Sequence, residues 1–210
     1  MTNFNKNIIN SLSNLSSACD LLKRDEKFLK TYESWINKLI FTINSGGTIF
    51  VCGNGGSFAH AQHLTAELVV RFKLNRKSIN AICLGSNQAN LTAIGNDFSF
   101  DQIFSRELSS SYKANDSVFI LSTSGNSTNV IKVAEYVREM GKSAISLTGK
   151  EGGKLKEITD NFVIVVAKNI IYNKPKSKIK LEFHNMDSNN LNNDVIISVL
   201  NKLQTIINTK

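Results

Sequence analysis

The stretch TIFVCGNGGSFAHAQHLTAEL (residues 48–68) decides the fold. Its first residues are apolar or β-branched as far as Gly53, and a pattern typical of an amphipathic helix follows the glycines. A short apolar run that ends in a glycine turn is typical of a buried parallel strand, because helices cover both faces of a parallel sheet. The stretch therefore predicts a strand, a tight turn over GNGGS (53–57) and a helix that begins near residue 57.

The alternation of strand and helix continues along the chain. Further strand-like runs lie at 79–84, 117–122, 143–148 and 161–166, and helical patterns lie at 57–72, 87–95, 101–112, 127–140 and 152–158. Strands that alternate with helices predict a doubly wound α/β fold, here with a parallel five-stranded sheet of the flavodoxin-like kind.

Amphipathic patterns also flank the predicted sheet. Apolar residues recur at helical spacing over 4–22 and 28–43, and again from Val195 to Ile207. The segment before Val195 contains the only proline, many Lys and Asn residues and no clean period, which is typical of a loop or a poorly ordered segment. We expect a single domain with four parts: an N-terminal helical extension (1–45), a sheet core (46–166), an irregular segment (167–194) and a closing helix (195–208).

The composition excludes several classes of protein. The 210 residues are 41% hydrophobic and 20% charged, and no apolar run reaches the roughly 18 residues of a membrane helix. The N-terminal segment lacks the pattern of a signal peptide, so we expect the cytoplasm. Cys19, Cys52 and Cys83 are odd in number and widely spaced, which favours reduced core thiols over disulfides or a cysteine metal site.

The net charge of +8 raises the question of nucleic-acid binding. Residues 168–210 carry seven Lys and three acidic residues, so half of the positive excess lies in the last fifth of the chain. No basic run interleaved with aromatic residues occurs, so nucleic acid is not an expected partner. A mildly positive field more simply favours an anionic small molecule.

Two predicted strands end in turns of small polar residues, GNGGS (53–57) and STSGNS (122–127). Open α/β sheets bind ligands at the carboxyl ends of their strands, and the N–H groups at helix starts bind anions. Either turn alone could be only a tight turn with a helix cap, but two turns at matching places favour a phosphate site. Neither has the spacing of a nucleotide fingerprint, so a phosphomonoester fits better than a nucleotide.

His60, His63 and Glu67 share one face of the helix behind the first turn, because they are spaced by three and four residues. A carboxylate there could move a proton, and His63 with Glu67 could ligate a divalent metal. Such a pair is usually a solvated surface pair. Because this pair follows a predicted phosphate-binding turn, we favour a role in proton transfer or metal binding over a surface pair.

Three segments resemble a known family: GNGGSFAHAQHLTAEL (53–68), LTAIGNDFSFDQIFSREL (91–108) and LSTSGNSTNVIKVAEYVREMGKSAISLTGKEGGKL (121–155). Together they resemble the sugar isomerase (SIS) domain of bacterial phosphoheptose isomerases, over roughly residues 1–166. The resemblance implies conversion of sedoheptulose 7-phosphate to D-glycero-D-manno-heptose 7-phosphate, for lipopolysaccharide heptose synthesis. It also implies a homotetramer with active sites between subunits, and often zinc.

The same resemblance implies a role for each candidate site residue. The phosphate would be held by Ser122, Thr123, Ser124 and Ser127, and the sugar would be lined by Asn54, Gly55, Gly56, Ser57, Asn96 and Asp97. His63 would ligate the metal. Glu67 would ligate it too, or act as the base that carries a proton between C1 and C2 through an enediol.

The C-terminal helix departs from the family pattern. The family carries a Gln and then a His there, whereas in register Asn193 and Asn201 stand at those positions, and no histidine follows His184. His184 could substitute only if the irregular segment folds back towards the site. The alternative to an enzyme is therefore a non-catalytic SIS module that binds a sugar phosphate, or a protein such as the bacterial replication initiator.

Overall fold

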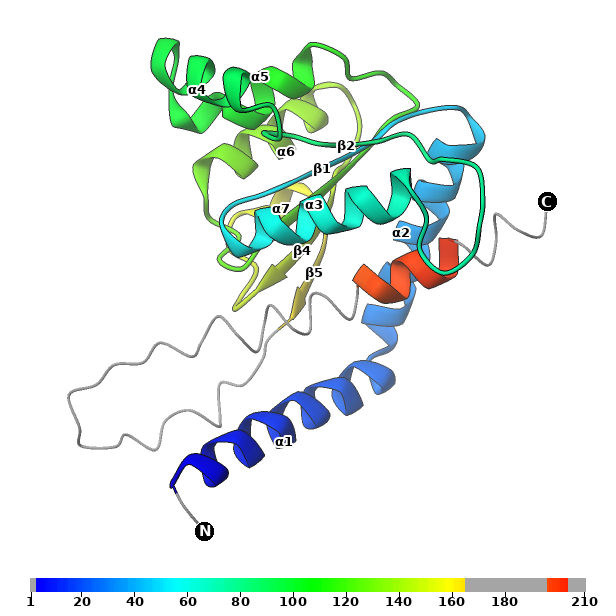
Figure 1. Ribbon diagram of the computed structural model, residues 1–210, viewed down its shortest axis with the longest axis vertical. Coiled ribbons are helices and arrows are strands. Elements are labelled where there is room, and N and C mark those ends of the chain that lie inside the picture. The colour runs from blue at the N-terminus through cyan, green and yellow to red at the C-terminus, as the bar shows by residue number, and fades with distance from the viewer. Residues whose placement is uncertain (1–2, 165–195, 204–210) are drawn as a thin grey trace.

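The structure is a computed structural model of the chain, and it describes residues 3–164 and 196–203 (Figure 1). Five parallel strands form one sheet in the order β2-β1-β3-β4-β5. They are β1 (Ile49–Gly53), β2 (Ala81–Cys83), β3 (Ser117–Ser122), β4 (Ile145–Gly149) and β5 (Asp160–Ile164). The doubly wound α/β fold predicted from the sequence is confirmed.

The register places β1 inside the sheet, with Ile49 opposite Ala81 on one side and Ser117 on the other. Every residue of β1 is buried, which explains why its sequence is apolar throughout rather than alternating. The chain runs from β1 to β2 on one side and then returns to β3 on the other side. The two strands that precede the polar turns are therefore neighbours, and the strand order reverses between them.

Helices cover both faces of this sheet (Figure 1). The helical elements before β5 are α1 (Asn3–Arg24), α2 (Glu26–Asn44), α3 (Gly56–Val69), α4 (Gln88–Asp97), the 3-10 turn η1 (Phe100–Gln102), α5 (Ile103–Ser109), α6 (Thr128–Glu139) and α7 (Leu155–Ile158), and all of them except the first half of α1 lie against the sheet or its covering helices. One core contains side chains of α2, α3 and the helical residues 196–203, and the core on the opposite face contains side chains of α5, α6 and α7. The molecule thus has three layers.

Three predicted helices end, divide or begin differently in the structure. Helix α3 ends at Val69 rather than 72, because the Arg76 guanidinium donates to the carbonyl oxygens of Glu67 at 2.6 Å and Leu68 at 2.8 Å. The helix predicted over 101–112 divides into η1 and α5. Helix α7 begins only at Leu155, because the two glycines before it adopt positive φ angles.

Helix α2 is part of the core rather than an extension of it. Trp35 is fully buried and packs edge-to-face against Phe119 with ring centroids 5.7 Å apart. Its indole N–H donates to the carbonyl oxygen of Asp160 at 3.2 Å, which ties α2 to the start of β5. The sequence predicted that residues 1–45 form a helical extension. Of the two helices in that range, α1 extends beyond the sheet core and α2 does not.

The first half of helix α1 projects away from the three layers (Figure 1), whereas Leu15, Ala18, Cys19 and Leu22 of its second half pack against the core. The α1 side chains Ile8, Leu12 and Leu21 are 65%, 62% and 71% exposed. At the other end of the chain, residues 196–203 are helical as predicted and bury Ile196, Val199, Leu200 and Leu203 in the core beside α2 and α3. The predicted irregular segment, 167–194, lies outside the described residues.

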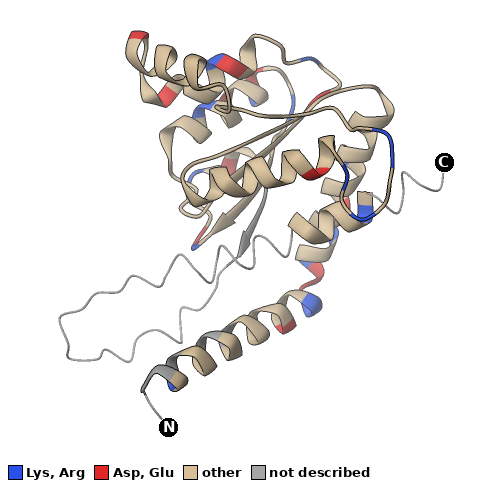
Figure 2. Cartoon of the chain, viewed as in Figure 1, with Lys and Arg blue, Asp and Glu red and all other residues tan. Residues whose placement is uncertain are grey.

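Lys and Arg are scattered over the helices and loops and do not form a stripe in the view of Figure 2. Cys52 and Cys83 are buried, all three cysteines are free, and burial raises the pKa of both buried thiols. Over residues 3–164 and 196–203, no helix has the length and apolar character needed to cross a membrane.

Candidate functional site

A cleft of about 260 Å³ lies where β1 and β3 end. The residues that line it are Asn54, Ser57, Leu121, Ser122, Thr123, Ser124, Ser127 and Lys150. Both predicted polar turns therefore contribute to one concave surface, at the point where the strand order of the sheet reverses. Ligands of open α/β sheets bind at this place.

The first turn needs its glycines to bring α3 close to the sheet. A Cβ atom on Gly53 would lie 2.8 Å from the carbonyl oxygen of Leu121, so a larger residue would push the neighbouring strand away. Gly55 adopts a φ of +52°, which residues with a side chain rarely adopt. The backbone N–H of Ser57 donates to the Asn54 carbonyl at 2.9 Å, and α3 begins there with its N-terminus at the cleft.

The second turn presents hydroxyl groups to the cleft. The Ser122 Oγ accepts from the N–H of Gly125 at 3.1 Å, and the Ser124 Oγ accepts from the N–H of Asn126 at 3.2 Å. Both oxygens act as acceptors in these bonds, so their O–H groups remain able to donate. Ser127 is the N-cap of α6, and its side chain makes no capping hydrogen bond there. Donors thus converge where the helix dipole favours an anion.

His63 and Glu67 form a pair on α3, with 3.4 Å between Nε2 and Oε1. Their neighbour His60 has a lowered pKa, first because of burial and then because of His63. Glu67 lies ten residues beyond Ser57, which is about 15 Å along a helix axis. Neither His63 nor Glu67 lines the cleft, so the structure brings this pair together but keeps it apart from the two polar turns.

Asn96 and Asp97 lie at the end of α4, where the Asn96 side-chain amide donates to Asp97 Oδ1 at 2.8 Å. Both are exposed and neither lines the cleft. Gly55 and Gly56 form the turn beside it and are also exposed. The predicted site residues therefore fall into three groups in one chain: the two polar turns, the His63–Glu67 pair and the Asn96–Asp97 pair.

The residues present give zinc only half of a site. His and carboxylate side chains at i and i+4 are ligands that zinc takes, and His63 with Glu67 supply two of them. Within the described part of the chain, no group of three or more His, Cys, Asp or Glu side chains could hold a metal. His184 and Asn193 lie outside that part, and Asn201, on the helix 196–203, offers an amide where the family carries an imidazole.

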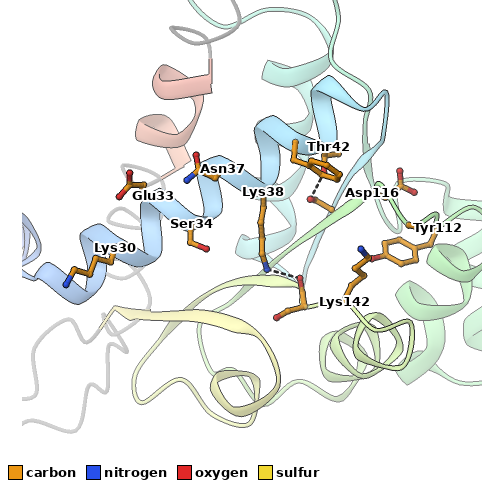
Figure 3. Close-up of a pocket in the computed structure, with 13 residues that line it drawn as sticks. Lys30, Glu33, Ser34, Asn37, Lys38, Thr42, Tyr112, Asp116 and Lys142 are labelled. Carbon is orange, nitrogen blue, oxygen red and sulfur yellow. Dashed lines mark hydrogen bonds between the residues drawn. The ribbon is translucent and has the colours of Figure 1, made fainter.

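A larger concave surface, of about 550 Å³, lies between α2 and the amino ends of β3 and β4 (Figure 3). Several of its polar side chains already have partners within the fold. The Thr42 and Ser117 hydroxyls lie 2.6 Å apart, the Asp116 carboxylate accepts from two backbone N–H groups at 2.7 Å, and Lys38 forms an ion pair with Asp160. The Thr42 and Lys38 contacts hold α2 against the sheet and the Asp116 bonds hold the neighbouring turns, so we do not assign chemistry to this surface.

Two residues of the site were not predicted from the sequence, Lys150 and Asn129. Lys150 lines the cleft from the turn that follows β4. The sequence could have pointed to Lys150, because GKEGG (149–153) is a glycine-rich turn that follows a strand and lies at the same edge of the sheet. Asn129 is buried in the first turn of α6 and bonds Asn54, and a single asparagine inside a helical pattern gave no signal.

Comparisons with known proteins agree with this geometry. The SIS domain family matches residues 21–149. A phosphoheptose isomerase of Helicobacter pylori (strain P12) is 40% identical over 145 residues, which cover 69% of this chain and 76% of that protein. Solved phosphoheptose isomerases from Neisseria gonorrhoeae and Francisella tularensis share the fold with TM-scores of 0.79 and 0.80 and 24% identity each. The first comparison covers 96% of this chain and 99% of the other, and the second covers 97% and 98%.

Proposed function

Because this chain belongs to the SIS domain family and, within it, to the phosphoheptose isomerases, we propose that it converts sedoheptulose 7-phosphate to D-glycero-D-manno-heptose 7-phosphate. The observation that carries the proposal is the hydroxyl-lined cleft at the ends of β1 and β3, with a helix behind it that presents a carboxylate. The product would serve the synthesis of lipopolysaccharide heptose.

The cleft fixes the phosphate end of the substrate. The hydroxyls of Ser122, Ser124 and Ser127 and the N–H groups at the start of α6 are donors, and a phosphate monoester offers oxygen atoms that only accept. Holding the phosphate restricts the sugar chain to a direction away from the turn. Orientation of this kind contributes to the rate, because the reacting carbons are held near the base and the entropy cost of positioning them is already met by binding.

The reaction moves protons between neighbouring atoms of the sugar. A proton leaves C1 of the ketose, an enediol forms, and a proton returns to C2, while a hydroxyl proton passes from O1 to O2. Glu67 is the carboxylate that we assign to the carbon proton. A carboxylate placed within hydrogen-bonding reach of the carbon can act as base and then as acid without leaving its position.

Zinc is part of the proposal, with His63 and one carboxylate oxygen of Glu67 as two of its ligands, which leaves the other oxygen of Glu67 for the carbon proton. When bound, the metal would stabilise the negative charge that develops on the sugar oxygens. The remaining ligands would come from outside the described residues or from water. Metal content measured by mass spectrometry, for the wild type and for His63→Ala, tests this assignment independently of activity.

We also propose a homotetramer whose active sites lie between subunits. In one chain, Glu67 is separated from the phosphate turns by about 15 Å of helix, and Asn96 with Asp97 lies outside the cleft. The exposed apolar side chains of α1 offer a surface that a second copy of the chain can cover. Buried free cysteines favour the cytoplasm as the compartment.

One observation favours a second function, a SIS module that binds a sugar phosphate or a protein without catalysis. Asn201 stands where the family has a histidine, and an amide cannot serve as an acid or a base near neutral pH. The two functions are separated by incubating the purified chain with sedoheptulose 7-phosphate, with zinc or with a chelator, and following the product by NMR. We expect turnover with zinc. Ligand binding without turnover would establish the binding module instead.

A further inference from the structure

Among the residues that the structure describes, the cleft at the ends of β1 and β3 is lined by a single charged side chain. Its lining consists of hydroxyl, amide and apolar side chains apart from Lys150, as far as the structure describes the chain. A phosphate monoester carries a charge of about −1.5 to −2 near neutral pH. Neutral donors and a helix dipole compensate only part of such a charge, so a cation at the cleft has a specific electrostatic purpose.

The backbone of Lys150 is held in an unfavourable conformation. Its φ angle is +53°, and in the described ranges no other residue than glycine has a positive φ. A residue with a Cβ atom adopts this conformation at a cost in free energy, and such positions cluster at functional sites. A glycine would remove the cost, so the presence of lysine requires a reason.

The turn that carries Lys150 is built onto the second phosphate turn. The N–H of Gly149 donates to the carbonyl of Thr123 at 3.1 Å, and the N–H of Lys154 donates to Asn126 Oδ1 at 3.0 Å. A Cβ atom on Gly153 would lie 2.6 Å from the carbonyl oxygen of Ser124, so the two backbones touch. Residues 149–154 and 122–126 therefore form one rigid unit, and this unit holds Lys150 at the rim of the cleft.

From this geometry we propose that Lys150 is the cation of the phosphate subsite, whose ammonium group binds the phosphate and selects phosphorylated sugars over free ones. No described ion pair occupies that ammonium group. The inference rests on the proposed function for the identity of the sugar, but not for the identity of the anion. Lys154, four residues further along the same turn, is exposed and does not line the cleft.

The test measures binding of inorganic phosphate by calorimetry to the wild type, Lys150→Asn, Lys150→Arg and Lys154→Asn. Asparagine tolerates a positive φ better than most residues, so Lys150→Asn removes the charge while the backbone keeps its conformation. We expect phosphate affinity to fall at least about tenfold in Lys150→Asn and to change less than about threefold in Lys150→Arg. It should not change in Lys154→Asn. Added salt should weaken phosphate binding by the wild type more than phosphate binding by Lys150→Asn.

Thermal unfolding separates binding from folding in the same proteins. Lys150→Gly relieves the backbone strain, so it should unfold no earlier than the wild type and still lose phosphate affinity. The inference is overturned if Lys150→Asn and Lys150→Gly bind phosphate as the wild type does. The inference is also overturned if Lys154→Asn loses as much phosphate affinity as Lys150→Asn, or if the wild type binds no phosphate.

The same proteins assayed for isomerase activity distinguish this inference from the proposed function. A wild type that binds phosphate through Lys150 but does not turn over sedoheptulose 7-phosphate supports the role of Lys150 and refutes the isomerase. An active wild type whose KM and phosphate affinity are unchanged in Lys150→Asn refutes the role of Lys150 and leaves the isomerase standing. In an active enzyme we expect Lys150→Asn to raise KM at least about tenfold for the phosphorylated sugar.

Discussion

Asn54 and Asn129 exchange two hydrogen bonds between their side-chain amides, although 75 residues separate them in the sequence. Asn54 Nδ2 donates to Asn129 Oδ1 at 2.8 Å, and Asn129 Nδ2 donates to Asn54 Oδ1 at 2.9 Å. The Asn129 oxygen also accepts from the backbone N–H of Val130 at 2.9 Å. The glycine turn after β1 is thereby locked to the first turn of α6 before any ligand binds.

Replacing Asn129 with leucine should destabilise the fold and weaken phosphate binding together. Asn129 is 2% exposed, so the change leaves the Asn54 amide without its partner at a cost of about 1–3 kcal/mol. Urea unfolding measures the loss of stability, and calorimetry with inorganic phosphate measures the loss of affinity. Asn37→Leu, at an exposed position of α2, is the control and should change neither quantity. An unchanged unfolding free energy for Asn129→Leu would contradict this role.

Glu67→Gln should reduce turnover of sedoheptulose 7-phosphate by at least about 100-fold, because the amide keeps the size of the side chain but cannot take up the carbon proton. Sugar-phosphate binding should survive, since the phosphate turns are intact. Glu135→Gln, on an exposed position of α6, is the matched control. Retention of full turnover by Glu67→Gln would assign the proton transfer to another residue.

Trp35→Ala should lower the free energy of unfolding by about 3–5 kcal/mol, because it empties a fully buried site and removes the contact with Phe119. Circular dichroism during urea unfolding measures this loss. Phe41→Ala, which truncates a side chain of α2 that is 62% exposed, should cost less than about 0.5 kcal/mol. Equal costs for the two variants would mean that α2 does not pack on the sheet as described.

The double variant Ile8→Lys with Leu12→Lys should reduce the molecular mass in solution, because charges on an apolar contact surface oppose association. Sedimentation velocity reports the mass directly. Asn10→Lys with Ser13→Lys adds the same charge to exposed polar positions of α1 and should leave the mass unchanged. If both double variants sediment like the wild type, the subunit contact lies elsewhere.

Tyr112 should make stability fall at high pH. Burial, with Asp116 and Tyr136 adding to it, raises the pKa of Tyr112 from 10.0 to about 12. The unfolded chain loses this phenol proton at a lower pH than the folded protein does. The stabilising contribution is therefore present below pH 10 and is lost as the pH rises through 12.

Unfolding free energies of the wild type and Tyr112→Phe measure this effect. Their difference at about pH 9 should shrink by about pH 11. Tyr112 is half-buried, so solvent screening keeps the change small. A difference that is constant over this range would show that Tyr112 titrates alike in both states.

The sequence allowed the strands and the phosphate turns to be predicted, because both are encoded locally. β1 and β3 are short apolar runs, and glycine or serine clusters follow each of them. Their adjacency follows from the general rules for parallel sheets rather than from any pairing signal. The cleft formed by Asn54, Ser57 and the second turn was therefore expected before its shape was known.

The remaining features depend on contacts between distant segments. The end of α3 at Val69 is set by Arg76, a residue in the loop beyond the helix. Helical periodicity alone therefore predicted a helix that was too long. Helix α2 carries an amphipathic pattern that does not say which surface it covers, and its docking through Trp35 became visible only in the structure. The separation of Glu67 from the cleft is likewise set by the course of α3 across the sheet, which no local pattern in the sequence specifies.

The close approach of Gly125 to Gly153 limits how this site can change through mutation. A side chain at either position would collide with the backbone of the facing turn, and both positions have positive φ angles. A substitution at either glycine would therefore force the two turns apart, and a library that varies these two positions should yield mostly destabilised clones. Efforts to direct the scaffold towards other phosphorylated sugars should leave the two glycines unchanged and randomise exposed positions such as Asn96, where variation does not disturb the architecture.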